Sequence, residues 1–191
     1  KALEAGADDF LTKPVDDLAL ITRVKNLARL KLLTDEMLMR VSTEQQMGYP
    51  GMLGDGVNIT GRNGRILMVE YREAAASRIV GALQSDNDVV HMVDPSHAML
   101  IAPSGDFDLL IVSLNLQNAD GLRLCSRLRS LDRTRHLPIM VIVEPGEEAS
   151  LHRGLDMPVD EYVQRPVNPS KLLARVRTQV TRNRKTEYLR S

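Results

Sequence analysis

The sequence lacks several features that would point to particular classes of protein. It has no Trp, two Phe and four Tyr in 191 residues, so its core must be built mainly from aliphatic side chains and methionine. Its 25 basic and 25 acidic residues cancel, so no whole-chain charge attracts nucleic acid or a membrane surface. No apolar run approaches the roughly 20 residues that a transmembrane helix needs. Composition therefore predicts a globular protein with no nucleic-acid or membrane partner.

Cysteine is nearly absent as well. The single Cys125 excludes a disulfide within the chain and favours a reducing, cytoplasmic location. Cys125 joins Leu122 and Leu128 at three-residue spacing on the apolar side of an expected helix, and no nearby histidine could activate its thiol. We interpret it as a small buried residue. The first residues show no signal-peptide pattern, and we expect this start to lie inside a longer protein.

Short apolar runs alternate with helical patterns along most of the chain. The expected strands are residues 65–69, 89–93, 108–113, 138–143 and 159–163. The expected helices are residues 73–84, a short one capped by Asp94, one capped by Asp120 and ending near 130, 147–154, and a long one from 169. Continuous apolar runs are typical of parallel strands buried on both faces. We therefore expect a flavodoxin-like α/β fold with sheet order 2-1-3-4-5.

The start of the chain repeats the end of this domain. Residues 8–16 (DDFLTKPVD) match residues 160–168 (DEYVQRPVN) position by position. The match continues downstream, pairing Leu20, Arg23 and Val24 with Leu172, Arg175 and Val176. This repeat predicts a C-terminal remnant of a first copy with an extended helix at 1–45, a Gly-rich linker at 46–63, a complete second copy at 64–183 and the start of an outgoing linker helix at 184–191.

The remnant of the first copy leaves two alternatives open. One strand with one or two helices buries too little surface to fold alone, so residues 1 to about 33 need another surface to pack on, or have lost theirs. The helix expected from Leu20 to Val41 carries apolar residues at a spacing near three and four. This spacing fits a short coiled-coil seam, and it fits simple packing on a neighbouring sheet equally well.

Several of these segments carry a family resemblance. Residues 6–14 (GADDFLTKP) resemble the last strand and Lys-Pro turn of response regulator receiver domains. Residues 108–122 are similar to the third strand and following loop of that family, and residues 137–143 to its fourth strand, so a CheY-like receiver fold is implied. Two receivers in tandem, the second altered, resemble PleD-type regulators, which end in a GGDEF diguanylate cyclase domain. The closing residues 184–190 resemble the linker helix into that cyclase.

The resemblance implies a specific chemistry. A working receiver takes a phosphoryl group from a sensor histidine kinase onto an aspartate, using Mg²⁺ held by clustered carboxylates, a lysine and a hydroxyl on the fourth strand. At these positions the second copy has Glu70 and Tyr71 for the acidic pair, Ser113 for the aspartate, Val143 for the hydroxyl residue and Arg165 for the lysine. One carboxylate is too few for a magnesium site, and serine is a weak nucleophile without a base. We expect no phosphorylation and no tight Mg²⁺ binding here.

In the first copy, Lys13 and Pro14 keep the family's Lys-Pro pair. The resemblance implies that Lys13 contacts a phosphoryl group, and the bond between the two residues is a candidate for the cis form. The aspartate and acidic pair that would complete the site are not in this sequence. Lys13 is therefore a remnant that behaves as a surface lysine, no cofactor is expected in this chain, and Mg²⁺ is expected only in an intact first receiver and the cyclase of a longer protein.

Without chemistry of its own, the second copy is expected to act through its surfaces. We predict a non-enzymatic adaptor that forms a homodimer through its last strand and last helix and so controls a cyclase. Its expected partners are a second copy, the first receiver and cyclase of the same protein, and a sensor histidine kinase acting through the first receiver. Four arginines of the last helix are candidate interface residues, with a solvated helix face as the alternative for any one of them: Arg175, Arg177, Arg182 and Arg184.

Two rival functions are weaker. A receiver that controls a DNA-binding or other output domain fits the same fold, but the basic tail at 181–185 is short and has no aromatic residues for stacking. A nucleotide-binding enzyme would need a Gly-rich loop after the first strand, where the acidic Glu70 stands instead. The histidines at 91, 97, 136 and 152 have no metal-ligand spacing.

Overall fold

A computed structural model describes residues 61–151 and 159–188, together with residues 17, 20, 21, 23–25, 27, 28 and 31. Five parallel strands form one sheet: β1 (Gly64–Val69), β2 (Asn87–Met92), β3 (Leu109–Ser113), β6 (Ile139–Val143) and β7 (Glu161–Gln164). The spatial order is β2-β1-β3-β6-β7. Counted along the five strands this is 2-1-3-4-5, so the predicted flavodoxin-like topology is confirmed.

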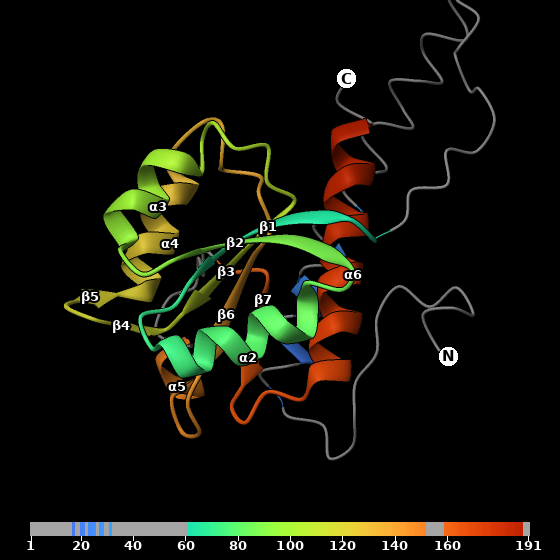
Figure 1. Ribbon diagram of the computed structural model, residues 1–191. Helices are drawn as coiled ribbons and strands as arrows, with labels where there is room; N and C mark the ends of the chain where they lie inside the picture. Colours follow the sequence, from blue (N-terminus) through green and yellow to red (C-terminus); the bar gives the residue numbers. More distant parts are fainter. Residues whose placement is uncertain are drawn as a thin grey trace, which may run out of the picture.

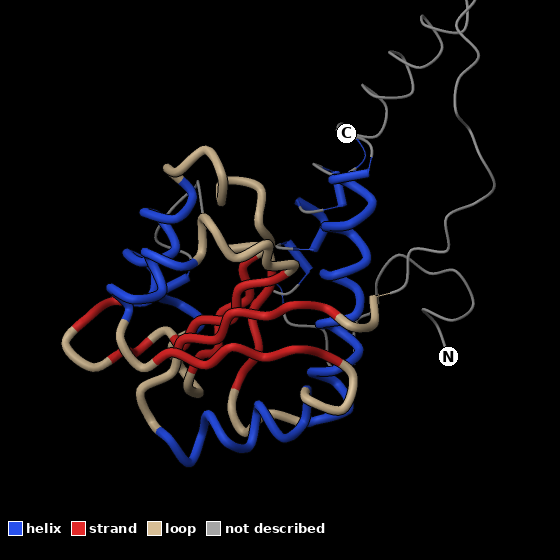
Figure 2. The backbone as a smooth tube through the Cα atoms, turned by 45° about the horizontal axis from the view of Figure 1, so that its top comes forward, coloured by secondary structure: helices blue, strands red, loops and turns tan. Residues whose placement is uncertain are grey.

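Helices cover both faces of the sheet, as Figures 1 and 2 show. They are α2 (Glu73–Leu83), α3 (Pro95–Ile101), α4 (Gly121–Arg129), α5 (Glu148–Leu151) and α6 (Pro169–Tyr188). Asp94 and Asp120 cap α3 and α4 as expected, accepting hydrogen bonds from the backbone N–H groups of Ser96 and Leu122 at 2.7 and 2.8 Å. Such caps explain why the polar residue ahead of each apolar pattern marked the helix start.

Alternate residues of each buried strand supply two separate cores. Ile66 and Met68 of β1 pack on the face that α2 and α6 cover. Leu67 and Val69 pack on the opposite face with α3, α4 and α5. Cys125 belongs to the second core and is fully buried, as predicted, and burial raises the pKa of its thiol to about 12. Both faces of the sheet are thus apolar, which is why the strands read as continuous apolar runs.

A small hairpin after β3 was not predicted. Strands β4 (Asn115–Leu116) and β5 (Ala119–Asp120) pair antiparallel and project away from the main sheet (Figure 1). The turn between them places Asn118 at φ +57°, a conformation that asparagine tolerates better than most residues. Strands of two residues carry no apolar period, so the sequence pattern could not show them.

The described residues between Asp17 and Lys31 are helical, and we call them the first-copy helix. Arg23 of this helix is 3% exposed, and its Nη2 lies 3.5 Å from Oε2 of Glu161 in β7. The first-copy helix therefore packs against the β7 side of the second copy. Lys13, Pro14 and nearly all of the expected linker at 46–63 lie outside the described residues. The expected boundary at 183/184 falls inside α6, which continues to Tyr188.

Candidate functional pocket

Three predicted site residues meet at the carboxyl edge of the sheet. Glu70 follows β1, Ser113 ends β3 and Arg165 follows β7, and parallel strands bring these ends together. The Ser113 hydroxyl donates to Oε2 of Glu70 at 2.5 Å, and Nη2 of Arg165 donates to the same oxygen. Nη2 of Arg165 also lies 3.2 Å from Oγ of Ser113. The Glu70 side chain is 1% exposed, so this carboxylate is satisfied by its own chain.

Two further residues complete the pocket, and sequence reasoning missed both. Nη2 of Arg72 lies 2.7 Å from Oε1 of Glu144, and Nε of Arg72 lies 3.4 Å from Oε1 of Glu70. Nε of Arg165 lies 3.2 Å from Oε1 of Glu144. Each arginine thus contacts both glutamates, and these four residues form a closed ring of ion pairs, which we call the Arg–Glu ring. The signal that could have found Glu144 is its place directly after β6, at the same sheet edge as Glu70.

The expectation that a single carboxylate remains in the pocket is therefore wrong. Glu144 is a second one, and the guanidinium groups of Arg72 and Arg165 neutralise the pair. Burial by itself raises the pKa of Glu70. The Ser113 hydroxyl, the Arg72 backbone N–H and the two guanidinium charges lower this pKa by more than burial raises it. The net pKa of Glu70 lies below its usual range, so the ring holds an ionised carboxylate.

The other two predicted pocket residues do not join the ring. Tyr71 is half-buried, and its ring centroid lies 5.6 Å from the guanidinium carbon of Arg72. Val143 is fully buried in the core between the sheet and α4. His91 lies nearby, with Nε2 at 2.7 Å from the Glu70 carbonyl oxygen. Among the described residues, no three His, Cys, Asp or Glu side chains cluster as metal ligands would.

The four arginines of α6 that were predicted as candidate interface residues are half-buried, and three of them bind groups of their own domain. Nη1 of Arg175 donates to the Tyr162 carbonyl at 2.7 Å and lies 3.5 Å from Oε1 of Glu161. Nε of Arg177 donates to Oδ2 of Asp86 at 2.8 Å. Arg182 is half-buried on the same helix, and Arg184 binds Asp108. Glu161 therefore lies between two arginines that the sequence repeat aligns, Arg23 and Arg175.

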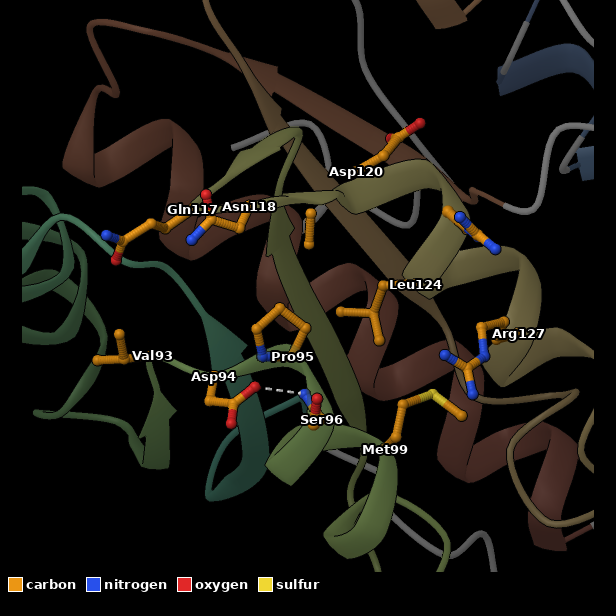
Figure 3. A pocket seen from close by; sticks show the side chains of 12 residues that line it. Val93, Asp94, Pro95, Ser96, Met99, Gln117, Asn118, Asp120, Leu124 and Arg127 are labelled. Atoms are coloured by element: carbon orange, nitrogen blue, oxygen red, sulfur yellow. Dashed lines mark hydrogen bonds between the residues drawn. The ribbon is translucent and has the colours of Figure 1, made fainter.

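A hollow of about 900 Å³ lies between α3, α4 and the β4–β5 hairpin (Figure 3). Asp94, Asn118 and Arg127 line it. Its two carboxylates, on Asp94 and Asp120, already cap α3 and α4, and Figure 3 shows Asp94 bonded to Ser96. These caps account for the acidic side chains without a ligand. Within the described part of the chain, no helix is both long and apolar enough to cross a bilayer.

The parallel 2-1-3-4-5 sheet and the pocket at its carboxyl edge define a receiver-type domain. A family model for the response regulator receiver domain matches residues 66–177, and the chain belongs to that family. The chain is 40% identical over 191 residues to the response regulator PleD of Caulobacter vibrioides (strain NA1000 / CB15N), covering 100% of this chain and 41% of that protein. It thus spans less than half the length of this curated relative.

Shorter matches come from other regulators. The phosphate regulon transcriptional regulatory protein PhoB of Rhizobium meliloti (strain 1021) is 40% identical over 75 residues, covering 39% of this chain and 33% of that protein. Among solved structures, a response regulator from Chloroflexus aurantiacus J-10-fl has a TM-score of 0.58 and 23% identity, covering 62% of this chain and 98% of that one. At this identity the structural likeness shows the fold alone.

Proposed function

We propose that this chain is the adaptor region of a PleD-type response regulator and that its second receiver does not accept a phosphoryl group. The Arg–Glu ring is the observation that carries the proposal. Ser113 stands where the acceptor aspartate is expected, and its hydroxyl donates to Glu70. A serine hydroxyl is a far weaker nucleophile than a free carboxylate, and the carboxylate that accepts its proton, Glu70, is a weak base because its pKa is lowered and Arg165 binds the same oxygen.

The same geometry argues against magnesium in this pocket. A divalent cation needs several oxygen ligands at once. Here the guanidinium groups of Arg165 and Arg72 each contact the carboxylates of Glu70 and Glu144. Mg²⁺ would have to displace two guanidinium groups that already neutralise these carboxylates. We therefore infer that the residues present do not fit the ion, and that a magnesium site belongs to an intact first receiver.

The first-copy helix supports an adaptor role. Arg23 packs against Glu161 of β7, beside Arg175 of α6, so the last strand and last helix of the second receiver take up a helix from the first copy. Leu20, Ile21 and Val24 stay exposed at 42%, 48% and 56%. By the repeat they correspond to Leu172, Leu173 and Val176, which pack in the core of the second receiver. We infer that an intact first receiver covers them and rests on the second receiver through Arg23.

In the longer protein, we propose that phosphorylation of the first receiver by a histidine kinase changes how the two receivers pack and so favours a homodimer. Dimerisation would bring two C-terminal cyclase domains together for cyclic di-GMP synthesis. A coupling free energy of about 1–3 kcal/mol is enough, because it changes dimer affinity by roughly 5–150-fold. The match to PleD over all 191 residues of this chain, at 40% identity, supports this assignment.

The test is phosphorylation with a small-molecule donor. The chain is incubated with acetyl phosphate and Mg²⁺, and its intact mass is measured, with a receiver of known activity as the positive control. We expect no phosphoryl adduct on residues 64–183. An adduct there would overturn the proposal that the second receiver is inert. Light scattering of the longer protein, with and without donor, tests the dimer. If the measured mass does not change on phosphorylation, the adaptor role is wrong.

A second candidate function is control of a DNA-binding output domain. Two relatives are named as transcriptional regulators: PhoB of Rhizobium meliloti and TcrA of Mycobacterium tuberculosis, which is 32% identical over 115 residues. These matches cover 39% and 59% of this chain, whereas the PleD match covers all of it. Salt-dependent duplex binding by the longer protein would favour this candidate over the cyclase.

A further inference from the structure

One side chain joins three separate parts of the receiver at the amino edge of the sheet. Nε and Nη2 of Arg184, near the end of α6, donate to the two carboxylate oxygens of Asp108 at 2.8 and 2.9 Å. Nη1 and Nη2 also donate to the carbonyls of Arg62 and Asn63 at 2.7 and 2.8 Å. The flat guanidinium fork can bind a carboxylate with two parallel bonds and still reach two carbonyls. A lysine could not make this set of contacts.

The backbone of the incoming segment, Gly61–Asn63, also touches α6 directly. A Cβ added at Gly61 would lie 2.1 Å from the Arg177 carbonyl oxygen and 2.6 Å from Oγ1 of Thr181, so only glycine permits this approach. Arg177 in turn donates to Asp86, whose carbonyl oxygen accepts from the Asn63 N–H at 2.7 Å. The chain that enters β1 and the helix that leaves the domain are thus in contact over two turns of α6.

This junction is distinct from the Arg–Glu ring. Asp108 precedes β3, whereas Ser113 ends it, so the two sites lie at opposite edges of the sheet. Asp108 is 8% exposed and also accepts a hydrogen bond from the Arg65 N–H at 2.8 Å. This bond helps to orient the carboxylate that Arg184 binds. The last buried residue of α6 is Asn183. The next residue, Arg184, donates four hydrogen bonds that tie this end of the helix to the domain.

We propose that Arg184 is a positioning residue that locks the outgoing helix to the incoming segment, so that the second receiver transmits movement of the first copy to whatever follows α6. The locking is a property of this chain, and its signalling use rests on the proposed adaptor function. Without the lock, the end of α6 would lose these four hydrogen bonds and should fray more readily, because helix ends with few tertiary contacts are marginally stable.

The test measures the position of the outgoing helix relative to the domain. Spin labels are placed at Ser77→Cys on α2 and Lys185→Cys on α6, both exposed positions, while the buried Cys125 stays unlabelled. Electron–electron distance measurements should give one narrow distribution in the parent. Arg184→Lys, which keeps the charge but loses the fork, and Asp108→Asn should each broaden it. Arg78→Ala, which removes an exposed guanidinium from α2, is the matched control and should not.

Gly61→Ala tests the coupling itself. Gly61 does not bond to Arg184, so broadening at Lys185 in this variant would show that the incoming segment sets the outgoing helix. Unchanged distributions in Arg184→Lys and Asp108→Asn would overturn the lock, and an unchanged Gly61→Ala would overturn the coupling. A thermal melt identifies any variant that fails to fold. If Arg184→Lys does not fold, the milder Asp108→Asn tests the lock in its place. None of these results depends on phosphorylation or on the mass of a dimer. The lock and the proposed function are therefore tested by separate experiments, and either can fail without the other.

Discussion

The guanidinium of Arg165 binds the carboxylate of Glu70 at the carboxyl edge of the sheet. The family resemblance predicts that Arg165 stands at the position of the phosphate-contacting lysine and Glu70 at a position of the metal-binding acidic pair. Here they neutralise each other, and Arg72 and Glu144 close the ring. The pocket therefore holds within its own side chains the charge balance that a working receiver obtains from Mg²⁺ and phosphate, and the first three predictions follow from this exchange.

Arg165→Ala should destabilise the domain. The Glu70 side chain is 1% exposed, and removing Arg165 leaves this buried charge with the more distant guanidinium of Arg72 as its remaining cation. We expect a loss of about 3 kcal/mol in the free energy of unfolding, measured by urea titration. The exposed Arg78→Ala is the control and should change stability by less than about 0.5 kcal/mol. Equal effects in the two variants would show that the ring contributes nothing.

Acid should weaken the fold through Glu70. Its folded-state pKa lies below its unfolded value, which is about 4.3 for glutamate. The stability that it contributes is thus fully present above the unfolded pKa and is lost as pH falls through the folded pKa. Urea unfolding between pH 7 and pH 3 should show a smaller loss in Glu70→Gln than in the parent. Parallel pH profiles for the two proteins would contradict this assignment.

Rebuilding the acidic pocket should need several changes at once. Ser113→Asp alone adds a carboxylate beside Glu70 while Arg165 still occupies the site, so we expect no phosphoryl adduct with acetyl phosphate. The combination of Tyr71→Asp, Ser113→Asp and Arg165→Lys supplies oxygen ligands and removes one guanidinium, and it should bind Mg²⁺ measurably by calorimetry. Mg²⁺ binding by Ser113→Asp alone would show that Arg165 is no obstacle.

Cys125 should be inert in the folded protein. Its side chain is fully buried, and burial raises the pKa of its thiol to about 12, so the reactive thiolate is scarce near neutral pH. A thiol reagent such as Ellman's should react slowly in buffer and rapidly in denaturant. A surface control, Ser77→Cys, should react at once under both conditions. Rapid labelling of Cys125 in the folded chain would contradict its place in the core.

Glu161→Gln should release the first-copy helix. The Glu161 side chain is 5% exposed and carries the negative charge between Arg23 and Arg175. Without that charge, the buried guanidinium of Arg23 and the half-buried one of Arg175 lie near a neutral amide, which disfavours docking of the helix. Amide exchange in residues 17–31 should quicken while exchange in the β-sheet core stays slow. The exposed Glu187→Gln on α6 is the control, and equal exchange in both variants would rule out the ion pair as the anchor.

The fold was largely predictable because its signals are local. Continuous apolar runs identified the five sheet strands, and Asp94 and Asp120 marked two helix starts. The strand expected at 89–93 begins at Asn87 instead, because the amide oxygen of Asn87 accepts from the Gly64 N–H and extends the pairing with β1. The β4–β5 hairpin has no local signal at all.

The pocket was predictable in part. Glu70, Ser113 and Arg165 follow from strand ends and family motifs, since parallel strands bring their carboxyl ends together whatever the loops do. Arg72 and Glu144 were missed because their roles depend on how two loops bring their side chains toward the same partners. The partners of the α6 arginines within the domain were not predicted for a related reason: an arginine pattern on a helix does not show which segments face it.

The sequence by itself determined the order of the strands, the repeat of residues 8–16 at 160–168 and the serine at position 113, because each depends on residue identity and spacing along the chain. Only the tertiary structure decided that two arginines close a ring with Glu70 and Glu144, and that Arg184 ties the end of α6 to Asp108 and the segment before β1. Most of those contacts join residues between 72 and 122 positions apart, and the spacing of apolar and polar residues carries no information about such distant pairings.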